Sequence, residues 1–214
     1  MRNREGNNPW VTVEDVTFTN NIVRHTASGI NILEQDYSPP SQVARNIRVH
    51  NNLFYDVDGY RWNGHGIWVL FNEPGGVNFA FTHNTMEAGG SSGRGVGFEH
   101  PSVEHAARVS GLVLNDNIFN AHVIGGPNGF VGTEALDYHA GTTWDFRRNA
   151  LVGNTQAYPY PTDNPPAAAN YDSVGFVDRA GGNYRLAPNS PYMRRVSAWN
   201  IGTVRRGSPC RAGR

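Results

Sequence analysis

The chain has 214 residues, with 18 Lys or Arg balanced by 18 Asp or Glu, so its formal net charge is zero. Its 25 Gly, 13 Pro and 17% charged residues are typical of turn-rich β structure in one domain. No apolar run reaches the roughly 18 residues of a membrane-spanning helix, and no signal-peptide pattern follows Met1. The single Cys excludes an internal disulfide.

One short pattern recurs along the chain: apolar, any, apolar, any, polar, Asn, any, apolar. The repeated residue is Asn21, Asn52, Asn84, Asn117 and Asn149, at separations of 31, 32, 33 and 32 residues. The alternation predicts a strand with one buried face, and the polar-Asn pair predicts a tight turn before a second strand. No helical periodicity separates the copies, so we expect them to stack as successive coils. Side chains in such a stack lie about 4.8 Å apart, which predicts an asparagine ladder of linked amides.

A further strand that follows a Gly is expected in three repeats, at residues 29–33, 66–70 and 95–99, with a degenerate fourth at 123–124. By this repeat, residues 9–155 resemble the right-handed parallel β-helix superfamily typified by pectate lyases. We therefore predict an all-β, right-handed, single-stranded parallel β-helix of five to six coils. An antiparallel sandwich also suits short strands with Gly and Pro turns, but its turns alternate ends and would not give one Asn column.

The chain is expected to form one domain, with coils in residues 1–155 and an irregular Pro- and Ala-rich loop, a last coil and an Arg-rich cap or tail in 156–214. Residues 174–178 and 182–191 resemble the terminal segment of bacterial secreted β-helix proteins. Residues 1–178 carry a net charge of 10 − 18 = −8, and residues 179–214 carry +8. We favour a cap that folds over the acidic body above a nucleic-acid-binding tail, because the chain has no Lys and the tail lacks interleaved aromatic residues.

The other end of the predicted stack is less well covered. Residues 1–9 are polar and too short to seal an apolar core, which leaves an exposed sheet edge. We therefore expect either that the chain is the C-terminal part of a longer β-helix or that it stacks on another copy of itself.

The strands that follow Gly also give the candidate substrate groove. Strict alternation predicts that one set of their side chains points inward, namely Ile30, Ile32, Ile67, Val69, Val96 and Phe98. Trp68 would then point outward beside Gly97, where an aromatic face can stack on a sugar ring unless a loop covers it. The candidate substrate-binding residues are Trp68, Asn31, Arg94 and His100.

The loops beside these strands supply the candidate catalytic residues, which are Glu99, Arg61, His65 and Glu73. Two carboxylates on adjacent or alternate coils would suit a glycosidase. A lyase needs a base and a group that neutralises a uronate carboxylate, and without Lys the base must be Arg, His or Tyr. Asp56 and Asp58 are candidate ligands for Ca²⁺, since hard cations take oxygen ligands, although their spacing does not require a metal.

The resemblance implies an extracellular or surface protein of bacterial type that binds a polysaccharide and carries lyase or glycosidase chemistry on the outer face of one sheet. The residues alone do not decide whether the chain is catalytic. The alternative is a non-catalytic structural module, such as a fibre, adhesin or spike, assembled end to end through the open edge.

Overall fold

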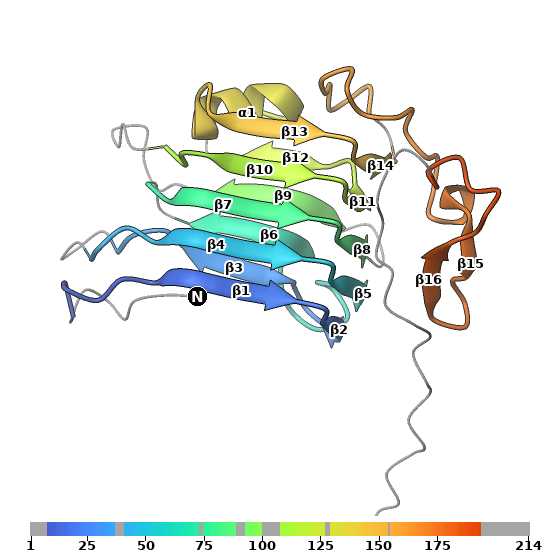
Figure 1. The fold of residues 1–214 in the computed structure, drawn as a ribbon, viewed down its shortest axis with the longest axis horizontal. Helices are drawn as coiled ribbons and strands as arrows, with labels where there is room; N and C mark the ends of the chain where they lie inside the picture. The colour runs from blue at the N-terminus through green and yellow to red at the C-terminus, as the bar shows by residue number, and fades with distance from the viewer. Residues whose placement is uncertain are drawn as a thin grey trace, which may run out of the picture.

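The computed structural model describes residues 8–36, 41–72, 75–88, 93–99, 108–126, 129–153 and 155–193. Their strands form three parallel sheets that run side by side along the molecule (Figure 1). The first sheet contains β1 (Glu14–Thr19), β4 (Arg45–His50), β7 (Val77–Thr82), β10 (Leu112–Asn115) and β13 (Trp144–Arg147). The second contains β2 (Ile22–Thr26), β5 (Leu53–Val57), β8 (Thr85–Ala88), β11 (Ile118–Asn120) and β14 (Ala150–Val152). The third contains β3 (Ile30–Leu33), β6 (Ile67–Asn72), β9 (Arg94–Glu99) and β12 (Val123–Gly125).

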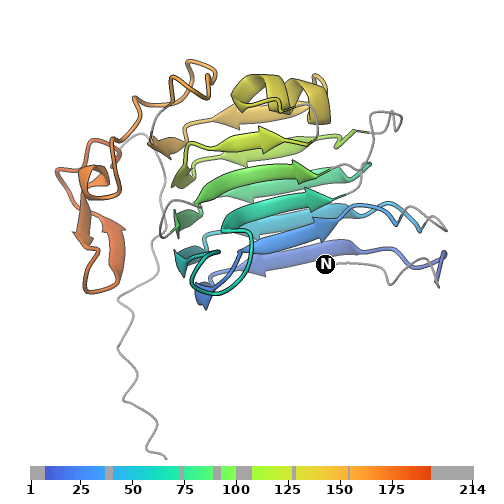
Figure 2. The ribbon, with the colours of Figure 1, turned by 180° about the vertical axis from the view of Figure 1, so that it is seen from behind.

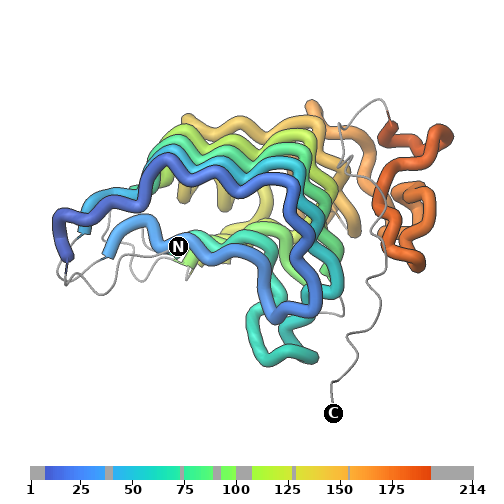
Figure 3. Tube along the Cα trace, turned by 60° about the horizontal axis from the view of Figure 1, so that its bottom comes forward, coloured from blue at the N-terminus to red at the C-terminus, as the bar shows by residue number. Residues whose placement is uncertain are grey.

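Consecutive strands go round the three sheets in turn, and each strand pairs with its equivalent in the next winding. The tube in Figure 3 shows the windings superimposed when the molecule is viewed close to its axis. The predicted parallel β-helix is therefore confirmed. The coil number differs from the prediction: the described residues form four complete coils, and a partial fifth has only β13 and β14.

The asparagine ladder is present along the turn between the first and second sheets. In each coil the Asn side-chain nitrogen donates to the side-chain oxygen of the Asn one coil further on, at 3.0, 2.9, 3.1 and 3.1 Å in chain order. The backbone N–H of each donor residue bonds to the same oxygen. Asn164, from outside the repeat, extends the ladder by accepting from Asn149.

The residue before each ladder Asn has a positive φ, between 52° and 60°, which allows the chain to turn sharply from one sheet into the next. Asn, Asp and His tolerate this left-handed conformation better than most residues, and they occupy four of the five positions. The two-residue pattern at each turn therefore has two effects: its first residue allows the sharp turn between sheets, and its second residue, the Asn, forms the ladder.

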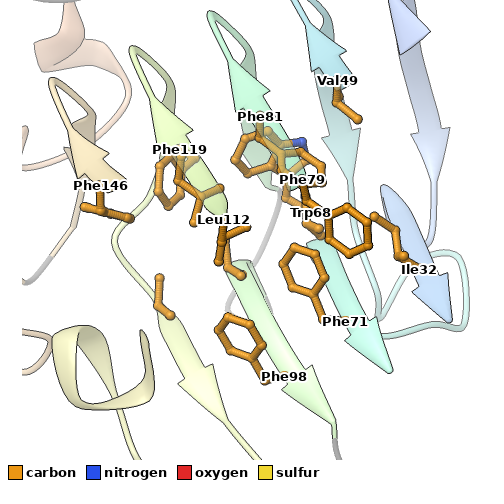
Figure 4. Close-up of a cluster of buried hydrophobic side chains, with 14 of the residues drawn as sticks. Ile32, Val49, Trp68, Phe71, Phe79, Phe81, Phe98, Leu112, Phe119 and Phe146 are labelled. Atoms are coloured by element: carbon orange, nitrogen blue, oxygen red, sulfur yellow. The ribbon is translucent and has the colours of Figure 1, made fainter. Parts of the chain in front are cut away.

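The interior of the coil is filled by stacked aromatic and aliphatic side chains, as Figure 4 shows. Of the six residues predicted to point inward, Ile32, Val69, Val96 and Phe98 belong to the main buried cluster, and Ile30 packs against it. Ile67 is also buried, but its side chain lies with that of Leu70 on the face of the third sheet toward which a Cβ on Gly97 would point, which is opposite to the core.

A helix covers the third sheet at the last coils, where the sequence showed no helical periodicity. α1 (Gly132–Ala140) lies beyond β12, and its Ala135, Leu136 and Ala140 join the main core. His139 on the same helix stacks on Phe98, with ring centroids 4.8 Å apart. The helix therefore closes this end of the apolar interior in place of a further strand.

The segment predicted to form a last coil instead packs along the side of the β-helix. A short 3₁₀ helix, η1 (Asp172–Val174), precedes the antiparallel hairpin β15 (Phe176–Asp178) and β16 (Asn183–Leu186). The hairpin lies beside the second sheet (Figures 1 and 2), where Tyr184 contacts Leu53 and Tyr55. The described part of the predicted cap therefore packs against the side of the β-helix, along the second sheet, and does not cover its end. The Arg-rich tail from residue 194 onward lies outside the described residues.

The first coil is the less covered end of the described structure. Its strands β1, β2 and β3 are each the last member of their sheet. Val16 and Phe18 on β1 are only half-buried, whereas their partners on β4, Ile47 and Val49, are 1% and 0% exposed. The core of the first coil is thus only half-buried by the described residues, and residues 1–7, on which the predicted exposed edge depends, lie outside them. None of the described helices is both long enough and apolar enough to cross a membrane.

Candidate functional site

The predicted aromatic platform at Trp68 does not exist, because its side chain is completely buried. The indole packs between Phe54, Phe81 and Phe119, with ring centroids 6.1, 6.0 and 5.2 Å away. Trp68 and its neighbour Val69 both belong to the core, so the strict alternation that predicted an outward indole fails where β6 begins. This was the main error of the sequence-based site.

The outer face of the third sheet consequently lacks the predicted sugar-stacking residue. Leu70, which pairs with Gly97, is 5% exposed and fills the space above that glycine. Asn31 is exposed and accepts a hydrogen bond from the Asn72 side chain at 2.6 Å. Glu99 is exposed at the end of β9. Among the described residues, this face therefore offers scattered polar groups with no exposed ring between them.

The other predicted residues are distributed as follows. Arg94 is half-buried at the start of β9. Burial lowers the pKa of His122, and the charge of Arg94 lowers it further. His65 is exposed, and its backbone N–H donates to Ser28. Glu73 and His100 lie outside the described residues.

An exposed cluster forms where the loop of residues 58–66, between β5 and β6, lies against the first coil. We call it the coil-corner cluster, and Figures 2 and 3 show the loop projecting from the coil. It brings together two predicted residues, Arg61 and Asp56, with residues that were not predicted, His25 and Trp62.

The ionic centre of the cluster is the carboxylate of Asp56, whose side chain is 28% exposed. Its Oδ2 lies 2.5 Å from Nδ1 of His25, and its Oδ1 lies 3.5 Å from the guanidinium of Arg61. With Nδ1 held by the carboxylate, the second ring nitrogen of His25 is the one left to exchange a proton with a ligand. The arrangement supplies a carboxylate, an imidazole and a cation at one surface point.

Two exposed rings border this centre. Tyr60 is 76% exposed and Trp62 is 39% exposed, both unusual for large apolar side chains in a folded protein. The guanidinium carbon of Arg61 lies 4.7 Å from the Trp62 ring centroid, within the range of a cation–π contact. His25 lies 6.3 Å from the same ring.

The loop that carries these rings is held in one conformation by its own hydrogen bonds. Oδ1 of Asp58 accepts from the backbone N–H groups of Tyr60 and Arg61, at 2.9 and 3.1 Å. A Cβ on Gly59 would come within 2.6 Å of the backbone at Gly64, so this close crossing requires glycine. The exposed rings are therefore presented by an ordered loop.

The same bonds give Asp58 a structural role, and Asp56 is already engaged by His25 and Arg61. Among the residues that the structure describes, no group of three or more potential ligands could hold a metal ion. The predicted calcium site at Asp56 and Asp58 therefore has no support from the geometry.

Part of the cluster could have been found from the repeat. His25 and Asp56 each lie four residues after a ladder Asn, in consecutive coils, so the register that aligns Asn21 with Asn52 also aligns this pair. Arg24 and Tyr55, three residues after the Asn, are aligned in the same way. The exposure of Trp62 has no such sequence signal, because it depends on the path of the loop.

Comparisons of the chain with models of protein families, with curated protein sequences and with solved structures gave no match. The structure by itself defines a parallel β-helix with an asparagine ladder and an exposed His–Asp–Arg–aromatic cluster. Function must be argued from that cluster.

Proposed function

We propose that the coil-corner cluster binds a saccharide chain, acidic or neutral, and that the protein acts on polysaccharide at a cell surface or outside the cell. The observation that carries the proposal is the exposure of Tyr60 and Trp62 on an ordered loop beside charged groups. The apolar face of a sugar ring stacks on such aromatic rings, and its hydroxyl groups need nearby donors and acceptors. Asp56, His25 and Arg61 supply both.

Binding can be tested by affinity electrophoresis through gels that contain polygalacturonate, xylan or a neutral glucan. Trp62→Ala should weaken retention by about tenfold, because a stacked ring and its buried area contribute on the order of 1.4 kcal/mol. Trp10→Ala is the matched control, since Trp10 is 72% exposed and precedes β1. Equal retention of wild type and Trp62→Ala on every gel would reject the cluster as the binding site.

The His25–Asp56 pair favours a lyase activity within this function. A lyase removes the proton beside a uronate carboxylate, and the chain has no Lys to serve as the base. In this proposal His25 takes that proton as the C=C bond forms and the C–O bond to the leaving sugar breaks, and the leaving oxygen takes a proton from the imidazolium or from water. Asp56 holds the imidazole in position, and Arg61 stabilises the negative charge that develops on the uronate carboxylate.

The activity test is formation of an unsaturated, ultraviolet-absorbing product from polygalacturonate. His25→Gln should abolish product formation, while retention on the gel should fall less than in Trp62→Ala, because the stacking rings remain. If wild type is retained but forms no product, the function is binding without cleavage. An active His25→Gln variant would remove His25 from the catalytic role.

A structural role is the second candidate, and the half-buried core of the first coil favours it. Unpaired strand edges are ready to pair with another chain. α1 packs beyond the opposite end of the third sheet, so the first coil is the end of that sheet through which two copies would pair. Sedimentation over a wide concentration range should then show a dimer. A monomer throughout would contradict this candidate.

A further inference from the structure

The structure contains a pocket of about 250 Å³ between the hairpin and the second sheet. Its lining residues are Arg24, Tyr55, Arg179, Ala180, Gly181, Gly182 and Tyr184. The strands β2 and β5 supply one wall, and the hairpin β15–β16 with its connecting turn supplies the other. Ligand pockets for drug-sized molecules are usually larger, at roughly 300 to 1,000 Å³, so this one suits a small group.

The two cations of the pocket are in different electrostatic situations. Arg179 bonds to the carboxylates of Glu87 and Asp172, and the hydroxyl of Tyr184 also donates to Glu87. These contacts hold the hairpin against the sheet and compensate the charge of Arg179. Burial and the bond to Glu87 raise the pKa of Tyr184, so its hydroxyl stays protonated.

Arg24 has no carboxylate partner among the described residues. Its guanidinium donates to the hydroxyl oxygen of Tyr55 at 2.8 Å, a neutral partner that leaves the charge uncompensated. Because that oxygen accepts from Arg24, the hydroxyl hydrogen of Tyr55 remains available to a ligand. A guanidinium and a hydroxyl thus present donors at the same pocket.

The pocket also has a counteracting charge. Asp178 lies behind the hairpin turn, where its Oδ1 accepts from the backbone N–H of Gly181 at 2.9 Å. This bond engages the carboxylate, but its charge limits how much negative charge the pocket can take. With the positive charge of Arg24 on one side and the negative charge of Asp178 nearby, the pocket suits a single oxyanion group, which Arg24 would hold through charge-assisted hydrogen bonds.

We propose that this pocket binds one oxyanion group, a carboxylate or sulfate, through Arg24 and Tyr55. The group could be a free anion or one carried by a sugar acid, since Tyr55 also lies 6.3 Å from His25 of the coil-corner cluster. Anion binding in this pocket does not depend on the proposed saccharide function, because neither Tyr60 nor Trp62 lines the pocket.

The test is a titration of ¹⁵N-labelled protein with galacturonate, galactose, acetate and inorganic sulfate, followed at the amides of Gly181 and Gly182. Shifts with the anions and none with galactose are expected, and raised salt should weaken them because the contact is partly exposed. Galacturonate tighter than acetate and sulfate assigns a sugar acid, whereas equal affinities assign a free anion. No shift with any anion would overturn the proposal.

Three variants separate the pocket residues from general effects on folding. Arg24→Gln should weaken anion affinity at least about tenfold, and Tyr55→Phe by about fivefold, as expected for charged and neutral hydrogen bonds. Arg48→Gln is the matched control, because Arg48 is an exposed arginine on the first sheet. Unchanged affinity in Arg24→Gln, with intact ladder amide signals, would also overturn the proposal. Loss of polysaccharide retention in Trp62→Ala tests the coil-corner cluster separately.

Discussion

The asparagine ladder can be tested by removing one amide from its middle and one from its end. Asn84 is fully buried, and its side-chain oxygen accepts from the backbone and side-chain nitrogens of Asn52, at 3.0 and 2.9 Å. Its nitrogen donates to Val49, Thr82 and Asn117. Asn84→Ala removes all five contacts and leaves the backbone N–H of Asn52 buried without its acceptor.

Each lost hydrogen bond contributes about 1 kcal/mol net, and an orphaned buried donor costs about 1 to 3 kcal/mol. Since several of the five contacts share one nitrogen, we expect Asn84→Ala to lower the free energy of unfolding by about 4 kcal/mol. Asn21, at the first coil, donates to Thr19 and Asn52 and is only half-buried. Asn21→Ala should therefore cost about 1 kcal/mol.

Urea denaturation of both variants measures the difference, provided that the dependence of the free energy on urea stays the same. If the two variants lose equal stability, the amide column contributes no more in the buried middle than at its end. The reasoning from buried acceptors and donors would then be wrong.

Three further predictions concern charge, pH and packing. Asn84→Asp should lower the free energy of unfolding at neutral pH and restore part of it as the pH falls, because a carboxylate facing the Asn117 oxygen has a raised pKa. Denaturation at several pH values checks this, and a free energy of unfolding that does not change with pH would contradict it. Burial and the neighbouring His83 and Arg48 lower the pKa of His50. The unfolded chain therefore binds more protons than the folded chain just below pH 6.5, so the free energy of unfolding should fall as the pH is lowered through this range. The fall should be less steep in His50→Gln. Gly29→Ala should destabilise by about 3 kcal/mol or more, because the new Cβ would lie 2.3 Å from the backbone oxygen of Trp68; a melting temperature within about 2 °C of wild type would disprove that clash.

The sequence predicted the scaffold well because the repeat records backbone geometry directly. Each corner has a residue of positive φ followed by an Asn; the Asn is visible in all five copies, and a residue tolerant of positive φ precedes it in four of them. The same regularity aligned equivalent positions of successive coils, including His25 and Asp56. The features that depend on local strand pairing and turn conformation could therefore be predicted from the sequence.

The site was predicted less well because it depends on departures from the repeat. Trp68 was placed outside by strict alternation, whereas two consecutive side chains turn into the core where β6 begins. α1 replaces a strand in a segment with no expected helix, and the hairpin packs beside the coils through the distant pair of Glu87 and Arg179. Such long-range contacts leave no periodic trace in the sequence.

The most direct test of the functional account is to map where a saccharide binds. An acidic oligosaccharide titrated into ¹⁵N-labelled protein should shift amides of residues 25–26 and 58–66, and Trp62→Ala should need about tenfold more ligand for the same shifts. Shifts confined to the outer face of the third sheet, around Asn31, Leu70 and Glu99, would contradict the coil-corner cluster as the binding site. An absence of shifts anywhere would contradict saccharide binding itself.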